Sequence, residues 1–388
     1  MRKELVIIYD TPSVNYDHNI MAHNLHYYLK FFDKLIILYW SKEGFSEIFE
    51  REGEKFIFYP YSKPYNSNYI TGIKFMAWIL RTLWKICQDA PKNTKLIFMT
   101  PIPIWSGIPT LIIGKLKRKK VILRLEGQKM DCLKIEDETL GVPKIFTAIK
   151  LLILKIIYFF TVPLYDFVIG ISRDVLKEAK NFGAKKTIWI PIPINLSPFK
   201  KEWSRNNSNN PVILSVGQIK KRKGFGETIE ALRLLKREEG LTSKLLIIGG
   251  VTNPRDEIHF RKFQEMAGGL NVEFRGEIKH DELAKIYNQA DIFVHASYVE
   301  TLGMVIMEAM ASGLPVIATK TSGAKDLVKD GKTGFLVSVG DPVSIKEKIL
   351  VLLKNPELRK SMGERAKKSI INLQKETDRK YKEIWQQF

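Results

Sequence analysis

Two glutamates, Glu300 and Glu308, stand eight residues apart around a predicted helix start. The stretch 303–312 is rich in good helix formers, and Gly313 and Pro315 follow it as residues typical of a helix end. The first backbone N–H groups of a helix lack partners within it, and the helix dipole adds partial positive charge there. The segment therefore predicts a site for an anionic group such as a phosphate, close to two carboxylates.

The two carboxylates and the anion site together suit a ligand that has a diphosphate in its middle. Glu300 comes just before the anion site, and Glu308 lies within the first two turns of the helix. Gly303 would let a ligand approach the backbone closely, because it has no side chain. One carboxylate can face each end of the ligand, which is the layout of a nucleotide sugar. Without its flanking residues, however, a pair of acids on a helix more often marks a solvated face.

The flanking residues resemble three motifs of one known family. Residues 296–318, ASYVETLGMVIMEAMASGLPVIA, are similar to the E-x7-E signature of the retaining GT-B glycosyltransferases of family 4. Residues 322–337, SGAKDLVKDGKTGFLV, resemble the family's glycine-rich turn, short helix and DG-x-TGFLV turn. Residues 216–232, VGQIKKRKGFGETIEAL, resemble its strand, basic loop and helix that starts after Lys-Gly. The resemblance covers the chain well from Phe167 onward and only in outline before that.

This resemblance implies roles for individual residues. Glu308 would bind the ribose hydroxyls, whereas Glu300 would bind hydroxyls of the donor sugar. Lys223 would meet the negative charge that develops on the departing diphosphate, so we predict Glu300 and Lys223 as the catalytic residues. The predicted donor-binding set is Gly217, Gln218, Arg222, Lys223, Gly276, Glu300, Thr301, Leu302, Gly303, Met304 and Glu308. Of these, the backbone amides of 302–304 would hold the phosphates.

The basic loop departs from the family pattern at one position. The family usually has an arginine just after the glycine that ends the preceding strand, and this chain has Gln218 there. Arg222 or Lys221 could supply the missing charge, since both lie in the same loop, or either could be solvated. We expect contacts to the base from the loop that begins at Gly276.

The first half of the chain offers two candidates on the acceptor side. Residues 10–18, DTPSVNYDH, stand where the family often has a glycine-rich loop, and we select Asn15 from them. Residues 124–128, RLEGQ, place Glu126 where the family often has a His-Gly pair. Glu126 has two interpretations of equal weight. It could contact the sugar or the acceptor, or it could form a structural pair with Arg124 or a nearby lysine.

The hydropathy pattern predicts an α/β protein. Short apolar runs, continuous rather than alternating, are typical of strands buried on both faces of a parallel sheet. They fall at 4–10, 34–40, 55–60, 95–100, 121–126, 167–172 and 187–191, and then at 211–217, 244–250, 272–276, 292–297, 315–319 and 334–338. With the resemblance, this implies the GT-B fold: two facing doubly wound Rossmann-like domains and a C-terminal helix that crosses back to the first.

The polar stretch after residue 195 sets the expected boundaries. We predict an acceptor-binding domain at 1–195, a linker at 196–210, a nucleotide-sugar-binding domain at 211–365 and a C-terminal helix at 366–388. Tyr381 would dock that helix on the first domain together with Trp385.

Residues 145–165 are nearly long and apolar enough to span a membrane, but Lys150, Lys155 and Pro163 argue against a span. Two interpretations remain, an amphipathic helix in a membrane interface and, slightly favoured, a core helix of the first domain. The basic run 115–120, KLKRKK, has two interpretations of equal weight. It could attract anionic lipid, or it could be a solvated charge run before a strand.

Composition fits a globular protein of 388 residues with a net charge of +20. Nucleic acid is not favoured as a partner, because the chain has no zinc-ligand spacing, RNP-like strand or KH-type loop. Anionic nucleotide sugars and anionic lipid headgroups explain the charge at least as well as nucleic acid does, and a lysine-rich solvated surface could account for the largest part of it. Cys87 and Cys132 give no disulfide framework, and the N-terminus lacks a signal-type apolar run, so we expect a cytoplasmic protein.

The leading interpretation is a retaining hexosyltransferase that moves a sugar from a UDP- or GDP-sugar to a cell-envelope glycan or lipid-linked acceptor. We expect no tightly bound cofactor, no required metal and possible peripheral association with the inner face of the membrane. The alternative is a GT-B pseudoenzyme or partner subunit that binds nucleotide without transfer, suggested by Gln218. An epimerase fits less well, and a dehydrogenase is unlikely because no G-x-G-x-x-G follows a strand.

Overall fold

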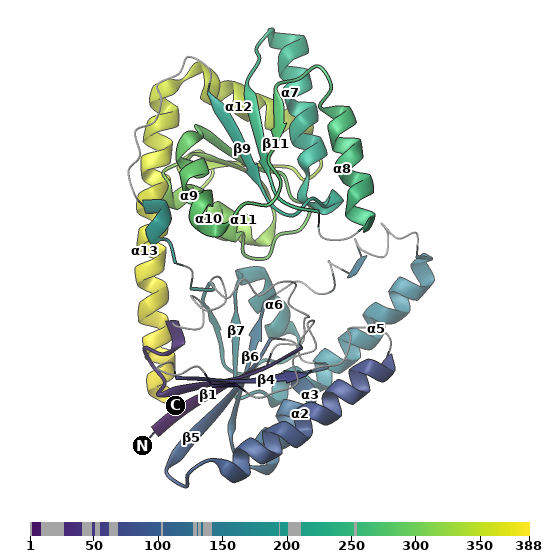
Figure 1. The fold of residues 1–388 in the computed structure, drawn as a ribbon, viewed down its shortest axis with the longest axis vertical. Helices are drawn as coiled ribbons and strands as arrows, with labels where there is room; N and C mark the ends of the chain where they lie inside the picture. Colours follow the sequence, from purple (N-terminus) through teal and green to yellow (C-terminus); the bar gives the residue numbers. More distant parts are fainter. Residues whose placement is uncertain are drawn as a thin grey trace. The chain divides into compact units, whose positions relative to one another are not determined.

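The computed structural model describes residues 2–8, 27–40, 49–50, 55–61, 69–101, 104–126, 130, 133–134, 142–193, 195–200, 211–251 and 254–388. The chain divides into two compact units, each with one sheet (Figure 1). The first unit comprises Met1–Pro193 and Thr377–Phe388, and the second comprises Ile194–Glu376.

The first unit is built on an eight-stranded sheet in the order β3-β4-β2-β1-β5-β6-β7-β8. Every neighbouring pair is parallel except β3 with β4. The strands are β1 (Arg2–Ile8), β2 (Lys34–Trp40), β3 (Phe49–Glu50), β4 (Phe56–Tyr61), β5 (Thr94–Thr100), β6 (Lys120–Leu125), β7 (Phe167–Gly170) and β8 (Thr187–Trp189). The helices are α2 (Tyr69–Asp89), α3 (Gly107–Leu116), α5 (Lys144–Thr161), η1 (Val162–Leu164) and α6 (Arg173–Asn181).

Both faces of this sheet are covered, which is why its strands read as continuous apolar runs. Along β1, Val6 and Ile8 enter one core, while Leu5 and Ile7 enter the core on the opposite face. The second of these cores includes the C-terminal end of α13 (Pro356–Gln387), with Tyr381 and Trp385 both buried. The predicted return of the C-terminal helix to the first unit is confirmed.

The second unit is built on a six-stranded parallel sheet in the order β11-β10-β9-β12-β13-β14. Its strands are β9 (Val212–Val216), β10 (Lys244–Ile248), β11 (Val272–Phe274), β12 (Ile292–His295), β13 (Val316–Thr319) and β14 (Gly334–Val337). Its helices are η2 (Ser197–Lys200), η3 (Lys221–Lys223), α7 (Phe225–Glu239), α8 (Pro254–Met266), α9 (His280–Gln289), α10 (Met304–Ala311), α11 (Ser322–Leu327), α12 (Pro342–Lys354) and the first part of α13. The strand order reverses between β9 and β12, and ligands of such sheets bind at the carboxyl ends on either side of a reversal.

The unit boundary differs in detail from the predicted linker. Leu196 and Phe199 are buried in the second unit, and the Phe199 ring packs edge-on against Tyr287 at 5.5 Å between centroids. Leu196 and Phe199 therefore pack inside this unit and are not part of an exposed linker. The rest of the predicted linker, 201–210, lies outside the described residues.

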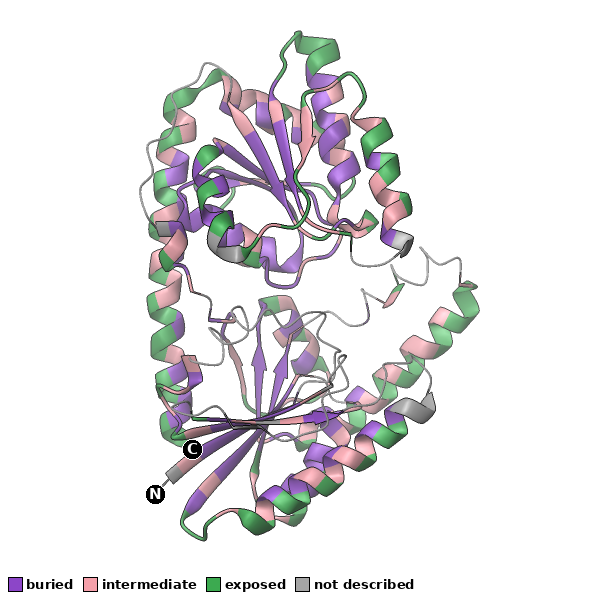
Figure 2. Cartoon of the chain, viewed as in Figure 1, coloured by how far each residue is buried: buried purple, intermediate pink, exposed green. Residues whose placement is uncertain are grey.

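The slightly favoured expectation for 145–165, a core helix, is wrong. The helix forms as α5, but only Tyr158 among its residues is buried (Figure 2). By length and composition it is the one helix in the described part of the chain that could cross a membrane. The reason for the error is that one side of α5 packs on the unit while its opposite side faces outward.

Candidate active site

Helix α10 begins at the predicted place. Gly303 is its N-cap residue with a left-handed φ of 80°, and a side chain there would also approach Ile306 Cδ1 to 2.9 Å. The first intrahelical bonds run from the N–H groups of Ile306 and Met307 to the Gly303 carbonyl oxygen. The helix ends at Ala311, close to the predicted end. The start of the helix therefore lies beside Glu300, since the Gly303 N–H donates to its Oε1 atom, and the N–H groups of the first turn can serve as an anion site there.

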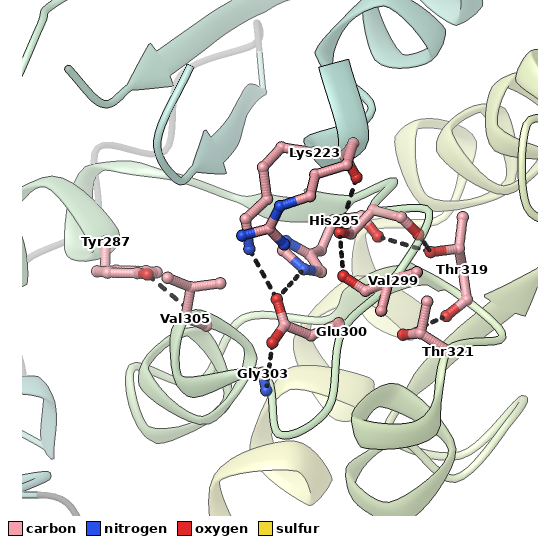
Figure 3. A network of polar contacts seen from close by, with 11 residues as sticks. Lys223, Tyr287, His295, Val299, Glu300, Gly303, Val305, Thr319 and Thr321 are labelled. Atoms are coloured by element: carbon pink, nitrogen blue, oxygen red, sulfur yellow. Dashed lines mark hydrogen bonds and ion pairs between the residues drawn. The ribbon is translucent and has the colours of Figure 1, made fainter. Parts of the chain in front are cut away.

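Glu300 accepts contacts from three directions (Figure 3). Its Oε2 atom lies 2.8 Å from Lys223 Nζ and 3.2 Å from His295 Nε2. Its Oε1 atom accepts a hydrogen bond from the Gly303 backbone N–H at 3.2 Å. The predicted catalytic pair, Glu300 and Lys223, is thus one ion pair, and it is joined directly to the start of α10.

The surroundings of this pair fix its charges. Burial opposes ionisation of Glu300, but the hydrogen bond from His295 and the charge of Lys223 outweigh it and hold the pKa of this carboxyl well below its ordinary value. Burial lowers the pKa of His295, and the nearby charges of Lys223 and Arg222 add to this, although Glu300 acts in the opposite direction. The site therefore holds an ionised Glu300 beside a neutral His295, whose Nε2 carries the proton that it donates.

The sheet topology brings these residues together. Lys223 ends η3, in the loop after β9, whereas His295 is the last residue of the neighbouring strand β12. Gly224 has a left-handed φ of 71°, and a Cβ atom there would lie 2.0 Å from the Ala296 carbonyl oxygen. Only glycine therefore lets the basic loop approach the β12 loop so closely.

Two hydrogen bonds to the Arg222 carbonyl oxygen hold the basic loop beside the loop after β12. The Tyr298 N–H donates to the Arg222 carbonyl oxygen at 2.8 Å, and Ser297 Oγ lies 3.0 Å from the same oxygen. Arg222 is half-buried and its charge acts on His295, whereas Gln218 and Lys221 are exposed. Of the two candidates for the missing arginine charge, Arg222 is the one whose charge acts at the site.

Glu308 has a partner that the sequence did not reveal. The Tyr287 hydroxyl, from α9, lies 2.9 Å from Glu308 Oε2, and both residues are buried. Burial, the Glu308 charge and this hydrogen bond raise the pKa of Tyr287 well above its ordinary value. Tyr287 therefore stays protonated and donates to the carboxylate, which fixes the orientation of Glu308.

The glycine-rich motif at 322–337 supports the same loop. The Gly323 N–H donates to the Glu300 carbonyl oxygen at 2.9 Å. A Cβ atom at Gly323 would lie 2.5 Å from the Leu302 carbonyl oxygen, so α11 packs directly on the backbone between Glu300 and Gly303. Leu302 and Thr301 are themselves buried. This motif holds the backbone that presents Glu300.

Two predicted glycines lie at the carboxyl edge of the sheet. Gly217 follows β9, and Gly249 follows β10. A Cβ atom at Gly249 would lie 1.7 Å from the carbonyl oxygen of Gly217. Gly276, after β11, accepts a hydrogen bond from the Gly249 N–H at 2.8 Å and has open space around its Cα. These loops lie on the β9 side of the strand-order reversal, where we expect the base.

The acceptor-side candidates are only partly described. Glu126 Oε1 lies 2.9 Å from Arg124 Nη2, so the pairing that we weighed against a sugar contact is formed. Arg124 is buried and contacts the Tyr28 hydroxyl. Asn15 and the whole of 10–18 lie outside the described residues. Among the residues that are described, no three His, Cys, Asp or Glu side chains gather into a metal-binding group.

Solved structures define the class of fold. HepE of Anabaena, solved with UDP and glucose, has a TM-score of 0.71 and 14% identity, covering 99% of this chain and 100% of its own. Sucrose-phosphate synthase of Thermosynechococcus elongatus has a TM-score of 0.76 and 19% identity, covering 100% of this chain and 99% of its own. The chain has the GT-B fold, as predicted.

Sequence comparison gives the family. The model for "Glycosyl transferases group 1" matches residues 197–369. An uncharacterized glycosyltransferase of Methanocaldococcus jannaschii is 41% identical over 205 residues, covering 52% of this chain and 54% of that protein. The capsular polysaccharide biosynthesis glycosyltransferase CapM of Staphylococcus aureus is 31% identical over 208 residues, covering 52% and 53%. The chain spans about half the length of the curated relatives it matches. The match to the glycosyl transferases group 1 model spans nearly all of the second unit, Ile194–Glu376, and confirms the resemblance.

Proposed function

We propose that the protein is a glycosyltransferase that moves a hexose from a UDP- or GDP-sugar to a hydroxyl of a glycan or lipid-linked acceptor, with retention of configuration. The observation that carries this proposal is the ion pair of Glu300 with Lys223 at the strand-order reversal, joined to the N-terminus of α10. It combines a fixed cation, a helix start that favours phosphate and a carboxylate that can accept from sugar hydroxyls.

Lys223 and α10 would stabilise the leaving group. When the bond between the sugar C1 and the phosphate oxygen breaks, its electron pair stays on the diphosphate. The acceptor oxygen forms its bond to C1 on the same face, and its proton passes to the departing phosphate oxygen. A lysine ammonium has three donors, so Lys223 can keep its 2.8 Å contact with Glu300 and still bind a phosphate oxygen.

Glu300 would hold the donor sugar and position Lys223. A carboxylate offers about four acceptor positions. Lys223, His295 and the Gly303 N–H occupy three directions, which leaves room for one hydroxyl of the sugar. Glu308, oriented by Tyr287, would accept from the ribose hydroxyls.

Positive side chains make a metal unnecessary in this scheme. Lys223 and Arg222 both lie close enough to His295 to lower its pKa, and their two positive charges exceed the one negative charge of Glu300. The same charge of Arg222 argues against the pseudoenzyme alternative, because it compensates for Gln218. The names of relatives such as CapM support a cell-envelope glycan as the acceptor, and we propose that the reaction takes place in the cytoplasm.

A nucleotide-sugar panel tests the proposal. UDP-, GDP- and ADP-sugars are each added to the protein and scored by thermal unfolding and by release of nucleoside diphosphate. A bound donor at 100 times its dissociation constant should stabilise the protein by about 2.7 kcal/mol. Stabilisation without turnover, with any acceptor or water, would favour the nucleotide-binding alternative. No stabilisation by any nucleotide would refute both.

A further inference from the structure

Helix α5 carries a band of exposed apolar side chains, which we name the α5 strip. It consists of Ile145, Phe146, Ile149, Leu152, Ile153, Ile156, Phe159 and Phe160. At about 100° per residue, these side chains fall within an arc of about 140° on one side of the helix. Soluble monomers rarely expose large contiguous apolar patches, and those that do often use them for interactions. In Figure 2 the helix is exposed along much of its length.

The opposite side of α5 is fixed to the first unit. Tyr158 is buried, and its ring packs edge-on against Phe182 with 5.4 Å between centroids. Leu151 packs on the core, and Val162, in η1 directly after the helix, belongs to that core. A membrane-spanning position would break these contacts. The helix therefore presents its strip while it lies along the unit.

Lysines border the α5 strip on both sides. In the same projection, Lys150 lies about 40° beyond one edge of the strip and Lys155 about 40° beyond the other. Lysine stems can lie along apolar surface while their ammonium groups reach water or headgroups. A helix with an apolar face between basic edges is typical of helices that lie in a membrane interface.

A second basic segment lies at the C-terminal end of α5. Lys115 and Lys120, the ends of the run 115–120, each place Nζ 3.4 Å from the carboxylate of Asp166, which follows η1. One acid thus faces a run with five basic residues. Leu116, within this run, is also exposed. Positive charge therefore adjoins apolar surface here as well.

We propose that the α5 strip docks on an anionic lipid bilayer, with the helix lying in the interface plane and not crossing the membrane. The lysines on both edges make an anionic surface complementary to the strip. In a symmetric dimer through the same strip, the lysine edges of the two copies would face each other and repel, so lipid fits better than a second copy. This docking does not depend on sugar transfer, so either proposal can fail without the other.

Co-sedimentation with vesicles tests the docking. The full chain should bind vesicles of equal parts phosphatidylcholine and phosphatidylglycerol, less so in high salt, and should bind phosphatidylcholine alone weakly. Phe159→Ser with Phe160→Ser should reduce binding by about tenfold or more. Ile258→Ser is the matched control, since Ile258 on α8 is 69% exposed, like Phe159 at 61% and Phe160 at 67%.

A charge variant separates the two contributions. Lys144 lies about 20° from Lys155 in the same projection, on the same edge of the strip, and both are exposed. Lys144→Gln with Lys155→Gln should weaken binding to the anionic vesicles. The same charge change at two exposed lysines of the second unit, Lys262→Gln with Lys285→Gln, should not. Equal losses in strip and control variants would overturn the proposal, as would absence of vesicle binding. If light scattering shows a dimer in the wild type that the phenylalanine-to-serine variant does not form, and no vesicle binding is seen, the strip would be assigned to contact with a second copy of the chain. If the double serine variant fails to fold, Phe160→Ser alone carries the test.

Discussion

Replacing Lys223 by alanine is the most direct test of the proposed site. The change removes the ammonium that lies 2.8 Å from Glu300 Oε2, and it leaves His295 and the Gly303 N–H as the partners of that carboxylate. Lys221→Ala is the matched control, because Lys221 belongs to the same η3 turn and is exposed. Both variants lose one positive charge from the same loop. Any difference in their turnover therefore shows that the position of the lysine matters and not only the charge of the loop.

Lys223→Ala should affect turnover more than it affects folding stability. Removing one group that stabilises charge in a transition state lowers turnover by about 100- to 1,000-fold, or about 2.7–4 kcal/mol. The effect on folding should be smaller, about 1–3 kcal/mol, because one partner of a mostly buried carboxylate is lost while two others remain. The Lys221 variant should stay close to the wild type in both respects.

The assay is turnover of the best donor from the nucleotide panel, measured beside thermal unfolding. Loss of turnover with a folded protein, and normal turnover in the control, is the expected result. A folded Lys223 variant with near-normal turnover would refute the role of this ammonium. Equal losses in both variants would mean that the net charge of the loop matters and not the ion pair with Glu300.

Three further predictions concern the carboxylates and their partners. Glu308→Ala should chiefly raise the donor KM and weaken nucleoside diphosphate binding. Glu300→Ala should chiefly lower turnover and weaken that binding less, through the loss of its contact with Lys223. Equal losses of nucleotide affinity in the two variants would contradict the divided roles. Tyr287→Phe should raise the donor KM with little change in turnover, because the lost hydroxyl contacts Glu308 and the Val305 carbonyl oxygen and is not proposed to touch the reacting atoms. An unchanged KM would show that the hydrogen bond to Glu308 is not needed for binding. Burial lowers the pKa of His295 in the folded protein. Below about pH 6.5 this residue therefore binds a proton more readily in the unfolded chain than in the folded one, and the free energy of unfolding decreases as the pH is lowered. The thermal midpoint of His295→Gln should therefore fall less between pH 7 and pH 5 than that of the wild type, and parallel curves would show that this group does not contribute.

The sequence predicted the sheets well, because both are parallel and covered on both faces. Each apolar run that we predicted as a strand contains one, and only the ends differ. Strand β3, Phe49–Glu50, was missed because a two-residue antiparallel pairing leaves no periodic signal. The start of α10 was predictable for a local reason, since a glycine before good helix formers is visible in sequence.

The partners of the two glutamates were harder to predict because they come from other elements. His295 ends a buried strand, and its type and its place at the carboxyl edge were the available signal. Tyr287 gave no local signal, since its contact with Glu308 depends on how α9 packs beside α10. The Gly323 contact with the Glu300 loop likewise exists only in the folded unit.

Helix α5 shows where hydropathy alone misleads. A helix that is apolar nearly all round is usually buried, which favoured a core position. Lys150 and Lys155 were the contrary signal, because they mark the two edges of the outward strip and would be costly inside a core. The positions of the lysines around the helix, and not only their number, predict a helix with one exposed side.

The position of the ion pair explains why three separate motifs are needed for one site. Lys223 comes from the loop after β9, Glu300 from the loop after β12, and Gly323 supports the Glu300 backbone from α11. Their contacts hold Lys223 in place before any donor arrives. A cation that is already oriented does not have to reorganise when charge develops on the leaving group, and in the proposed reaction this would be the source of its effect on turnover. Glu300 would therefore contribute to turnover in two ways, by its own contact with the sugar and by fixing the ammonium that meets the diphosphate.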